Sequence, residues 1–436
     1  MLTSALLLAA CSGRNGTFYA GEPLVPNAPF AQSPIHHVVI IVQENRSFDN
    51  LFYNFPGADS ATSGVNSHGA TVALQPHTLE GGGGDPGHFH TSFQTAFENG
   101  VMQRFNLEGL WGFVGSTYSQ LASDSNLVYS YVPQSEIQPY WTLAQRYTLA
   151  DRMFQSNGGP SYPAHQYLIA AQSGGASEVP TIGPWGCDAP ANSTVALIDS
   201  NGNDVEPGVF PCFNYATIGD ELDAAHIPWR YYTPALDTTA GLFSAYDAIR
   251  HVRYGADWTN DVISPETQVL TDIASGQLAS VTWVIPSFPN SDHPLAQSNT
   301  GPAWVSAVVN AIGSSPEWND TAILILWDDW GGWYDHVVPP QLDAMGLGFR
   351  VPLIVVSPYA KHGYVSHQQH EEASIIKFIE DNFALPSLNQ ADARADDLLD
   401  CFDFTQAPQP FVRIHAARSG ADFLRERHVA GPNDPI

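Results

Sequence analysis

Four short apolar runs, each bounded by turn residues, constrain the fold of this chain more than any other feature. None of them alternates apolar with polar residues, which is typical of strands buried on both faces of a parallel sheet. Helical patterns, such as those at 304–312 and 374–383, lie between the runs. Strands that alternate with helices predict an α/β fold built on a doubly wound sheet. The four predicted strands, all expected to be parallel, are 37–42, 281–286, 322–327 and 352–357.

Polar side chains follow three of these runs, at the point where each predicted strand ends. VVIIVQ leads into Glu44 and Asn45, VTWVIP leads towards His293, and AILILW leads into Asp328 and Asp329. Ligands of open α/β sheets bind in the crevice beyond the carboxyl ends of the strands. We therefore expect these acids, the amide and the histidine to gather at one edge of the sheet.

The adjacent carboxylates of Asp328 and Asp329 predict a metal site. At the end of an apolar strand, the two groups would repel each other unless a cation lay between them. Glu44 and Asn45 would add oxygen ligands, and an all-oxygen set favours Ca²⁺, Mg²⁺ or Mn²⁺. An isolated Asp-Asp pair is more often a surface or turn feature, but tryptophans flank this one on both sides in the string WDDWGGW.

Ser161 lies in the string GGPSYP, ahead of a helical pattern at 164–171. A serine at this place is close to the free N–H groups and the positive dipole end of the helix. Such a helix end binds phosphate and would also favour an alkoxide. The alternative is a plain N-cap serine, and the local sequence by itself favours that alternative.

Two of the 16 histidines lie in loops of special composition. His88 is in DPGHFH, after a glycine-rich loop, and His293 is in SDHP. Histidine is suited to protonating a leaving alcohol or orienting phosphate oxygens, so these two are the candidates for such a role. His367 and His370 are instead expected on a solvated turn.

The charge balance excludes some functions. The chain has 44 acidic residues against 16 basic ones, with Lys361 and Lys377 as its two lysines, for a formal charge of −28. Such a surface repels nucleic acid and anionic membranes at neutral pH, so a nucleic-acid-binding role is not expected. A low-pH habitat and a compositional bias of the source organism both explain this excess of acids.

The start of the chain predicts export. Residues 2–10 are apolar, and Leu8-Ala9-Ala10-Cys11 resembles a bacterial lipobox in which Cys11 is lipidated after cleavage. A truncated ordinary secretory signal is the alternative. We expect a signal segment at 1–11, a tether at 12–33, and a single catalytic domain at 34–436. The protein would then be periplasmic, at the cell surface or extracellular, with membrane contact through a lipid anchor at Cys11.

The remaining cysteines fit an exported protein. Cys187 and Cys212 bracket a loop rich in Asn, Asp, Gly and Pro, and this spacing predicts a disulfide that closes the loop. Cys401 lies among apolar residues in LLDCFDF and is expected to be a buried free thiol. None of the cysteines has the spacing of a zinc site.

One string gives the chain a family resemblance. HHVVIIVQENRSFDNLF resembles the opening motif of the bacterial phospholipase C and acid phosphatase A phosphoesterase family, within the alkaline phosphatase superfamily. Further matching strings follow in order, among them HFHTSFQTAFENGVM, GGPSYPAHQYL and WVIPSFPNSDHP. The resemblance covers nearly everything from 35 to 404. It implies an alkaline-phosphatase-like fold, in which a mixed, mostly parallel sheet is flanked by helices on both faces.

The resemblance also implies roles for particular residues. The family's nucleophile, which also touches the metal, matches Ser161, and its phosphate-facing histidines match His88 and His293. Its remaining metal ligands match Glu44, Asn45, Asp328 and Asp329. The second acid of the pair is often Glu in the family. The acid phosphatases carry a His-His pair where 239–244 here reads TAGLFS, which argues against an acid-phosphatase-like pocket.

These observations together predict a secreted, metal-dependent phosphoesterase. We expect Ser161 to attack phosphorus and form a phosphoserine, and His293 or His88 to protonate the leaving alcohol. The substrate stays open between a phosphodiester such as a phospholipid, as for a phospholipase C, and a phosphomonoester. A phospholipase needs an apolar entry to its pocket, for which the candidate aromatic residues are Phe89, Tyr162, Trp330 and Trp333.

Two other functions are weighed against this one. A catalytically inactive surface-binding protein on the same scaffold is disfavoured because the five central positions keep workable chemistry. A sulfatase would use Cys/Ser-x-Pro-x-Arg, and the string SYPAH at 161–165 has the Ser-x-Pro start but lacks the arginine.

Overall fold

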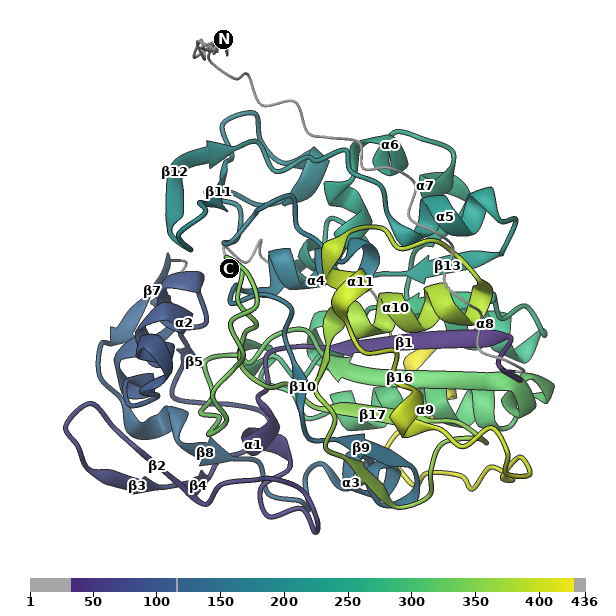
Figure 1. The fold of residues 1–436 in the computed structure, drawn as a ribbon, viewed down its shortest axis with the longest axis horizontal. Coiled ribbons are helices and arrows are strands. Elements are labelled where there is room, and N and C mark those ends of the chain that lie inside the picture. Colours follow the sequence, from purple (N-terminus) through teal and green to yellow (C-terminus); the bar gives the residue numbers. More distant parts are fainter. Residues whose placement is uncertain (1–32, 115–116, 427–436) are drawn as a thin grey trace, which may run out of the picture.

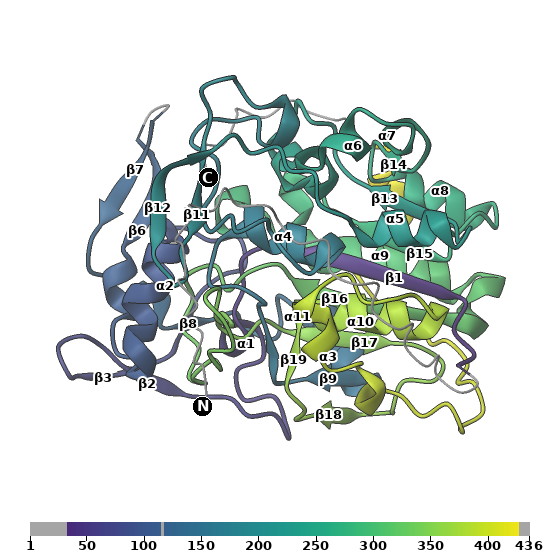
Figure 2. The ribbon, with the colours of Figure 1, turned by 45° about the horizontal axis from the view of Figure 1, so that its top comes forward.

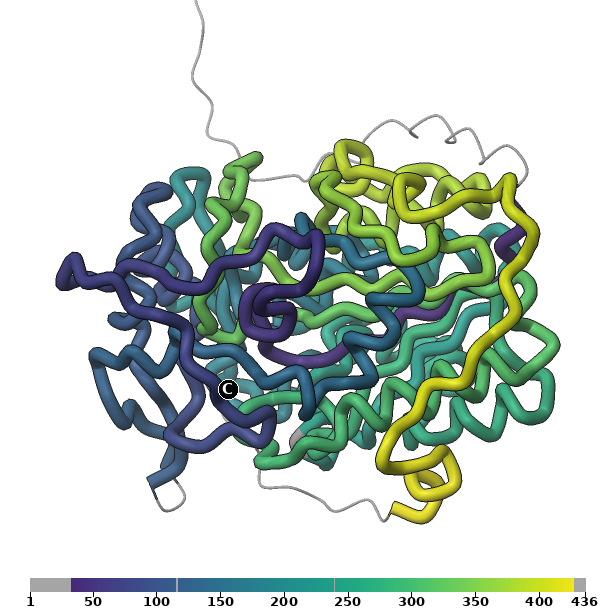
Figure 3. The backbone as a smooth tube through the Cα atoms, turned by 90° about the horizontal axis from the view of Figure 1, so that it is seen from below, coloured from purple at the N-terminus to yellow at the C-terminus, as the bar shows by residue number. Residues whose placement is uncertain are grey.

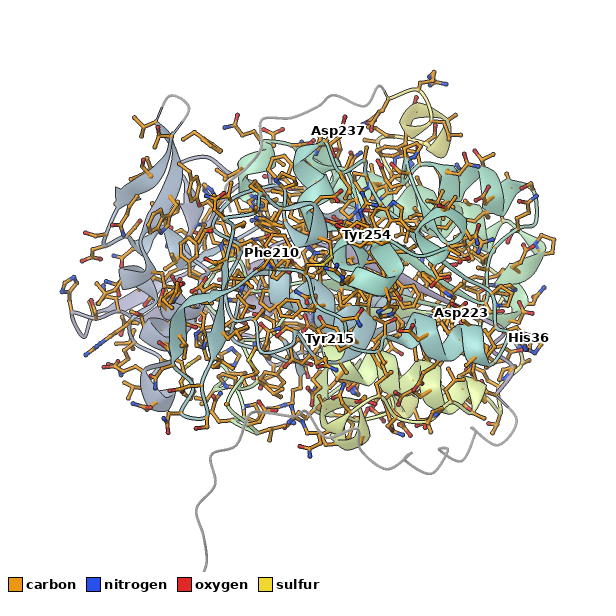
Figure 4. The ribbon with its side chains drawn as sticks, turned by 90° about the horizontal axis from the view of Figure 1, so that it is seen from above. His36, Phe210, Tyr215, Asp223, Asp237 and Tyr254 are labelled. Atoms are coloured by element: carbon orange, nitrogen blue, oxygen red, sulfur yellow. A yellow bond between two sulfur atoms is a disulfide. The ribbon has the colours of Figure 1, made fainter. Side chains whose placement is uncertain are left out.

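The computed structural model describes residues 33–114 and 117–426 (Figure 1). The predicted signal segment, its lipobox at Cys11, and the predicted tether up to residue 32 lie outside the described residues. Among the helices of the described part, none combines the length and the apolar character needed to cross a membrane. Exposed acids such as Asp223 and Asp237 stand on the face shown in Figure 4.

An eight-stranded sheet occupies the centre of the molecule, in the order β14-β13-β15-β1-β16-β17-β9-β18. Neighbouring strands are parallel except in the two pairs that β17 makes. The predicted mixed, mostly parallel sheet is therefore confirmed. In sheet order, the strands are Val262–Ile263, Trp229–Tyr232, Val281–Val284, His37–Gln43, Thr321–Trp327, Leu353–Val356, Thr148–Ala150 and Tyr364–Ser366.

The direction of β17 differs from the prediction that all four apolar runs are parallel. β17 runs antiparallel to β16, with Leu326 opposite Leu353. The reason is the connection. Between Trp327 and Leu353 the chain forms no crossover helix, and it therefore re-enters the sheet from the edge at which β16 ended. A strand that re-enters from that edge has to run back, because parallel neighbours require a crossover.

Helices cover both faces of the sheet, as the register of the strands shows. Trp283 of β15 shares a face with Leu324 of β16 and so points away from the face of Trp327. Its indole N–H donates to the carbonyl of Leu168 in α4, at 3.0 Å. Trp327 packs edge-on against Tyr140 of α3, with 4.9 Å between the ring centroids. α4 and α3 therefore lie on opposite faces.

The two layers contain the longest helices. α4 packs against α10 on one side, and α3 and α8 pack against α9 on the other. Their bounds are Ser161–Ala170 for α4, Glu372–Phe383 for α10, Gln138–Arg146 for α3, Gln268–Ala274 for α8 and Gly301–Gly313 for α9. The predicted helices at 304–312 and 374–383 are thus confirmed.

Shorter elements surround this core. The helices are α1 Phe48–Leu51, α2 His90–Phe97, α5 Ile218–Ala224, α6 Arg250–Arg253, α7 Asp257–Asn260, α11 Gln390–Arg394 and α12 Gly420–Phe423. The strands of small sheets are β2 Ser63–Val65, β3 Thr71–Ala73, β4 Gln75–Pro76, β5 Asp85–Pro86, β6 Leu110–Val114, β7 Thr117–Ala122, β8 Ser130–Tyr131, β10 Met153–Phe154, β11 Val195–Ile198, β12 Asp204–Val209 and β19 His370–Glu371.

Much of this periphery gathers beyond the carboxyl ends of β1 and β16. The purple and blue segments that follow β1, from α1 to β8, lie together at that end of the molecule in Figures 1 and 3. They have a hydrophobic cluster of their own, which includes Phe105, Tyr129, Trp330, Tyr334 and Phe349. Because Trp330 and Tyr334 come just after β16, this cluster fixes the chain that follows the central strand.

The cysteines and one histidine test further predictions. Cys187 and Cys212 form a disulfide and Cys401 is a buried free thiol, so both predictions are confirmed. The expectation of a solvated turn is wrong for His370, which is buried and bonds Asp396 at 2.7 Å. The backbone pairing of β19 with β10 draws this residue inward.

Candidate active site

The ends of β1 and β16 bring the predicted acids and amide together. The two strands pair in register up to Gln43 and Trp327, so Glu44 and Asp328 follow at adjacent points of the sheet edge. The backbone N–H of Asn45 donates to Asp328 Oδ1 at 2.9 Å. These side chains are fully buried. The strand-end pattern thus placed this part of the site from the sequence.

A glycine allows the closest contact at this edge. Asn45 has φ 60°, a left-handed conformation that asparagine tolerates better than most residues. Gly331, with φ +62°, packs against it so tightly that a Cβ there would lie 2.1 Å from the Asn45 carbonyl oxygen. Asp329 Oδ1 accepts a hydrogen bond from Gly331 N at 2.6 Å. The glycine-rich turn after the Asp-Asp pair therefore locks both strand ends against each other.

Ser161 reaches the same carboxylates from α4. Pro160 is the N-cap and has no side-chain cap, and Ser161 is the first residue of the helix. Its hydroxyl lies 3.1 Å from Asp329 Oδ2 and 3.4 Å from Glu44 Oε2. The plain N-cap alternative does not hold, because the hydroxyl faces the acids rather than the backbone of its own helix. Figure 2 shows α4 beside the carboxyl end of β1.

His165 is a site residue that sequence reasoning missed. It lies one helical turn after Ser161, and its Nε2 is 2.9 Å from Glu44 Oε1 and 3.5 Å from Asp328 Oδ2. Residues four apart share one face of a helix, and this spacing was the signal that could have identified it. Glu44, His165 and Asp328 together form a group whose ligand atoms all lie within 4.8 Å of one another.

Burial and mutual contacts shift the pKa values of this cluster. Burial and the neighbouring Asp328 raise the pKa of both Glu44 and Asp329 well above its ordinary range. Burial also works against the charge of Asp328, but hydrogen bonding and attraction to His165 lower its pKa to about 2. Burial lowers the pKa of His165, and its acidic partners outweigh this and raise it to about 10. Without a further cation, the charged forms of His165 and Asp328 and the neutral forms of Glu44 and Asp329 are therefore favoured.

This donor set fits a hard divalent cation. The three carboxyl groups and the Ser161 hydroxyl supply oxygen ligands in a buried place, and the raised pKa of Glu44 and of Asp329 shows that the protein does not compensate the charge of either group. Asn45 Oδ1 is also buried, and it accepts no hydrogen bond from any residue that the structure describes. An orphaned amide oxygen beside unbalanced acids is what a site built for a cation would contain.

His88 and His293 form a neighbouring group with Asp85. Their ligand atoms also lie within 4.8 Å of one another, and all three side chains are buried. His293 Nδ1 accepts a hydrogen bond from Leu295 N at 3.2 Å, which leaves its Nε2 free of that bond. Burial, together with the nearby ring of His88, lowers the pKa of His293 to about 3. The neutral form of His293 is therefore favoured before an anion binds.

Arg46 holds the loop that carries His293. Its Nε and Nη2 donate to the carbonyl oxygen of Asp292 at 3.0 and 2.8 Å, and Nη2 also donates to Leu79 O at 2.8 Å. Glu44 N donates to Ser291 O at 2.8 Å. Two residues of the ENRSFD string, Glu44 and Arg46, thus tie this loop to the end of β1.

Three of the four aromatic residues expected at an apolar entry are buried. Trp330 and Trp333 are fully buried in the interior, and Tyr162 is buried with its hydroxyl donating to Pro211 O. Phe89 is partly exposed, and its ring stacks on that of His88 with 6.2 Å between the centroids. Phe243 also contacts the site, because its ring stacks on that of His165 at 5.6 Å, with 6° between the planes. An aromatic ring thus lies in the segment that replaces the His-His pair.

Several relatives of this chain are named as phospholipases C. The chain is 24% identical to phospholipase C B of Mycobacterium tuberculosis, over 92% of this chain and 85% of that protein. It is 26% identical to the non-hemolytic phospholipase C of Pseudomonas aeruginosa, over 87% of this chain and 59% of that protein. It is 28% identical to non-specific phospholipase C6 of Arabidopsis thaliana, over 87% of this chain and 74% of that protein.

A solved structure and a family model complete the comparisons. A protein of the alkaline phosphatase superfamily from Vibrio parahaemolyticus matches with a TM-score of 0.40 and 9% identity, over 88% of this chain and 76% of that chain. This likeness is partial, and the fold description stands on the sheet itself. The Phosphoesterase family model matches residues 35–386, so the chain belongs to this family of ester-bond hydrolases.

Proposed function

We propose that this protein is an exported, divalent-metal-dependent phosphoesterase in which Ser161 is the nucleophile. One observation carries the proposal: the Ser161 hydroxyl lies 3.1 Å from Asp329 and 3.4 Å from Glu44, which come from two neighbouring strand ends. A hydroxyl nucleophile beside a cluster of buried acids that can hold a metal ion is suited to metal-dependent phosphoryl transfer. The workable chemistry of the cluster argues against an inactive scaffold.

The residues that would hold the ion come from three elements. They are Glu44, Asn45, Ser161, Asp328 and Asp329, and the favoured ions are Ca²⁺, Mg²⁺ and Mn²⁺. When bound, the ion would lower the pKa of the Ser161 hydroxyl and offset the negative charge of the phosphate. His165 supplies a positive charge 2.9 Å from Glu44 and 3.5 Å from Asp328.

The protein residues then divide the reaction between them. Ser161 Oγ, whose proton is lost to solvent as its pKa is lowered, attacks phosphorus in line, and the bond from phosphorus to the leaving alcohol breaks. The negative charge of a bound phosphate raises the pKa of His293, so that its imidazolium gives a proton to that alcohol. Neutral His293 then takes a proton from a water molecule that attacks phosphorus, the bond from phosphorus to Ser161 Oγ breaks, and the phosphate product leaves with Ser161 and His293 restored. We assign the proton to His293 because both ring nitrogens of His88 already have protein partners.

The substrate class we propose is the phosphodiester of a phospholipid, with phosphomonoesters as the alternative. The relatives named above as phospholipases C support this choice. Phe243 supports it too, since an apolar ring lies beside the site where acid phosphatases of the resembling family carry polar histidines. Turnover of phosphatidylcholine should therefore exceed that of a simple aryl phosphate, and the reverse order would favour the monoester.

Export and domain organisation complete the proposal. The Cys187–Cys212 disulfide is typical of proteins that mature in an oxidising compartment. We propose that residues 34–436 form one catalytic domain behind an export signal, with a lipid anchor at Cys11. Palmitate labelling that persists in a Cys11→Ser variant would exclude this anchor.

The decisive test of the nucleophile is Ser161→Ala. We expect turnover to fall by roughly 10³-fold or more, while the unfolding temperature stays near that of the wild type. Ser306→Ala is a matched control, because Ser306 is also a buried helical serine, with its hydroxyl bonded to Pro302 O. Substantial turnover by the Ser161→Ala variant would show that another group attacks phosphorus.

A further inference from the structure

We infer that His88 is a positioning residue, which sets the orientation of the Asn45 amide so that its oxygen faces the acid cluster. This inference rests on the proposed metal centre and assigns His88 a role different from contact with phosphate. The juxtaposition that carries it is a chain of two hydrogen bonds, from Asn45 to the ring of His88 and from that ring to the backbone at Pro86.

The two bonds have a defined direction. His88 Nδ1 lies 2.8 Å from the carbonyl oxygen of Pro86, which can only accept, so Nδ1 carries the hydrogen. In the neutral ring, Nε2 is then an acceptor. Asn45 Nδ2, which can only donate, lies 2.8 Å from that Nε2. In both of these hydrogen bonds a donor therefore meets an acceptor, and the His88 ring needs a single tautomer.

The consequence for Asn45 is a fixed amide. Because its nitrogen is turned towards His88, its oxygen is turned elsewhere, and that buried oxygen has no donor among the described residues. The backbone N–H of Asn45 is bonded to Asp328, which holds the residue beside the carboxylates. A neutral amide oxygen is a good ligand for a hard cation, whereas an inverted amide would present two N–H groups and repel it.

The backbone that orients His88 is itself held firmly. Pro86 belongs to β5, which pairs with β6, and Gly87 N donates to Gly109 O at 3.1 Å. On the other side, a Cβ at Gly332 would lie 2.5 Å from the Pro86 ring. The small sheet β5-β6-β7 and the turn after Asp329 therefore enclose the carbonyl that fixes the ring. This gives the small sheet, which lies outside the central one, a function in preparing the metal site.

The first test measures ion binding directly, without any turnover. Mn²⁺ alone is titrated into the full chain after treatment with a chelator, and its dissociation constant is measured by calorimetry. We expect His88→Ala to weaken binding by about 10-fold to 100-fold, the usual effect of removing a group that orients a ligand. His88→Gln should recover most of the affinity, because its amide oxygen can accept from Asn45 Nδ2. His88→Lys, which can only donate, should not.

His90→Gln is the matched control for local damage. His90 is buried two residues away and bonds Asp204 at 2.7 Å, outside the acid cluster. The His90→Gln variant should bind Mn²⁺ as tightly as the wild type does. If His88→Ala binds Mn²⁺ as tightly as the wild type, or if His88→Lys and His88→Gln bind Mn²⁺ with equal affinity, His88 does not position Asn45.

A double-mutant cycle separates positioning from general destabilisation. If His88 acts through Asn45, the Mn²⁺ affinity of the Asn45→Ala variant should not fall further when His88→Ala is added, since the effects of coupled residues are non-additive. Additive losses would contradict the inference. A wild-type chain that binds no Mn²⁺ would overturn the metal centre itself, whereas normal wild-type binding with an unaffected His88→Ala variant overturns the positioning role alone.

Discussion

His165 shows how one side chain decides the balance of the site. It is the cation of the cluster, and it contacts Glu44 and Asp328 at 2.9 and 3.5 Å in a fully buried place. Removing one partner of a buried ionic group leaves the other charges uncompensated, which costs about 3–5 kcal/mol. A bound divalent cation would compensate the same acids. The protein without its ion should therefore depend on His165 more than the protein with it.

His165→Gln tests this dependence. We expect the ion-free variant to lose about 3 kcal/mol of unfolding free energy, and added divalent ion to restore part of the loss. His367→Gln is the control, because His367 is a largely exposed histidine. Equal losses with and without the ion would contradict the account.

The pH dependence of this loss follows from the pKa of His165, which is raised from 6.5 to about 10. Because the pKa of His165 is raised in the folded state, its contribution to the free energy of unfolding is fully present below the unfolded-state pKa. That contribution is lost as pH rises through the folded-state pKa. The contribution also needs Asp328, whose pKa is lowered from 3.8 to about 2 and which loses its stabilising charge as pH falls towards that value. In urea unfolding without ion, the difference between wild type and His165→Gln should be largest between about pH 4 and 6.5 and vanish towards pH 10.

At the scale of elements, the site depends on the contact between the ends of β1 and β16. The turn after β16 can approach Asn45 only because residue 331 is glycine, as a Cβ there would meet the Asn45 carbonyl at 2.1 Å. A substitution would push apart two segments that together supply four of the five proposed ligands. The effect should therefore reach ion binding as well as stability.

Gly331→Ala should lower the free energy of unfolding by about 1–3 kcal/mol, from steric conflict and a strained positive φ, and should weaken Mn²⁺ binding. Gly69→Ala separates the two causes, since Gly69 has φ +74° and nothing within 4 Å of a Cβ. That control should show the backbone strain without the loss of ion affinity. Calorimetric titration and urea unfolding of both variants measure the two effects. Normal ion affinity in Gly331→Ala would show that the contact does not support the site.

At the scale of the whole molecule, the ion should stabilise a strongly acidic chain. A ligand that binds the folded state alone adds about 2.7 kcal/mol at a concentration 100 times its dissociation constant. Treatment with a chelator should therefore lower the unfolding temperature and abolish turnover, and the matching divalent ion should restore both. Asp328→Asn should remove most of this response, and a full response in that variant would contradict the proposed ligand set.

How far the sequence predicted this architecture depends on whether a feature is local. Glu44, Asn45, Asp328 and Asp329 follow apolar strands directly, and parallel neighbours bring strand ends to one edge, so their meeting could be predicted. The Cys187–Cys212 disulfide and the helices at 304–312 and 374–383 could be predicted from local spacing and periodicity.

The features that were missed or misplaced depend on contacts with distant segments of the chain. His165 was missed because the acids that it faces come from other elements. The direction of β17 was wrong because an apolar run does not reveal whether the chain before it crosses over or turns back. His370 was misplaced because its burial follows from pairing with β10, more than 200 residues earlier in the chain. Trp330 and Trp333 were considered for a pocket entry but are buried in the interior. The sequence does not distinguish an aromatic residue of the core from one that lines a pocket.

The measurement that tests the central claim most directly is the identification of the phosphorylated residue during turnover. The full chain is mixed with a phosphate ester whose leaving alcohol departs quickly, quenched in acid within the first turnover, digested and examined by mass spectrometry. The account predicts phosphate on the peptide that contains Ser161, on Ser161 itself, and no such peptide from the Ser161→Ala variant. Turnover that proceeds at the same rate with no phosphate on Ser161 at any quench time would contradict it.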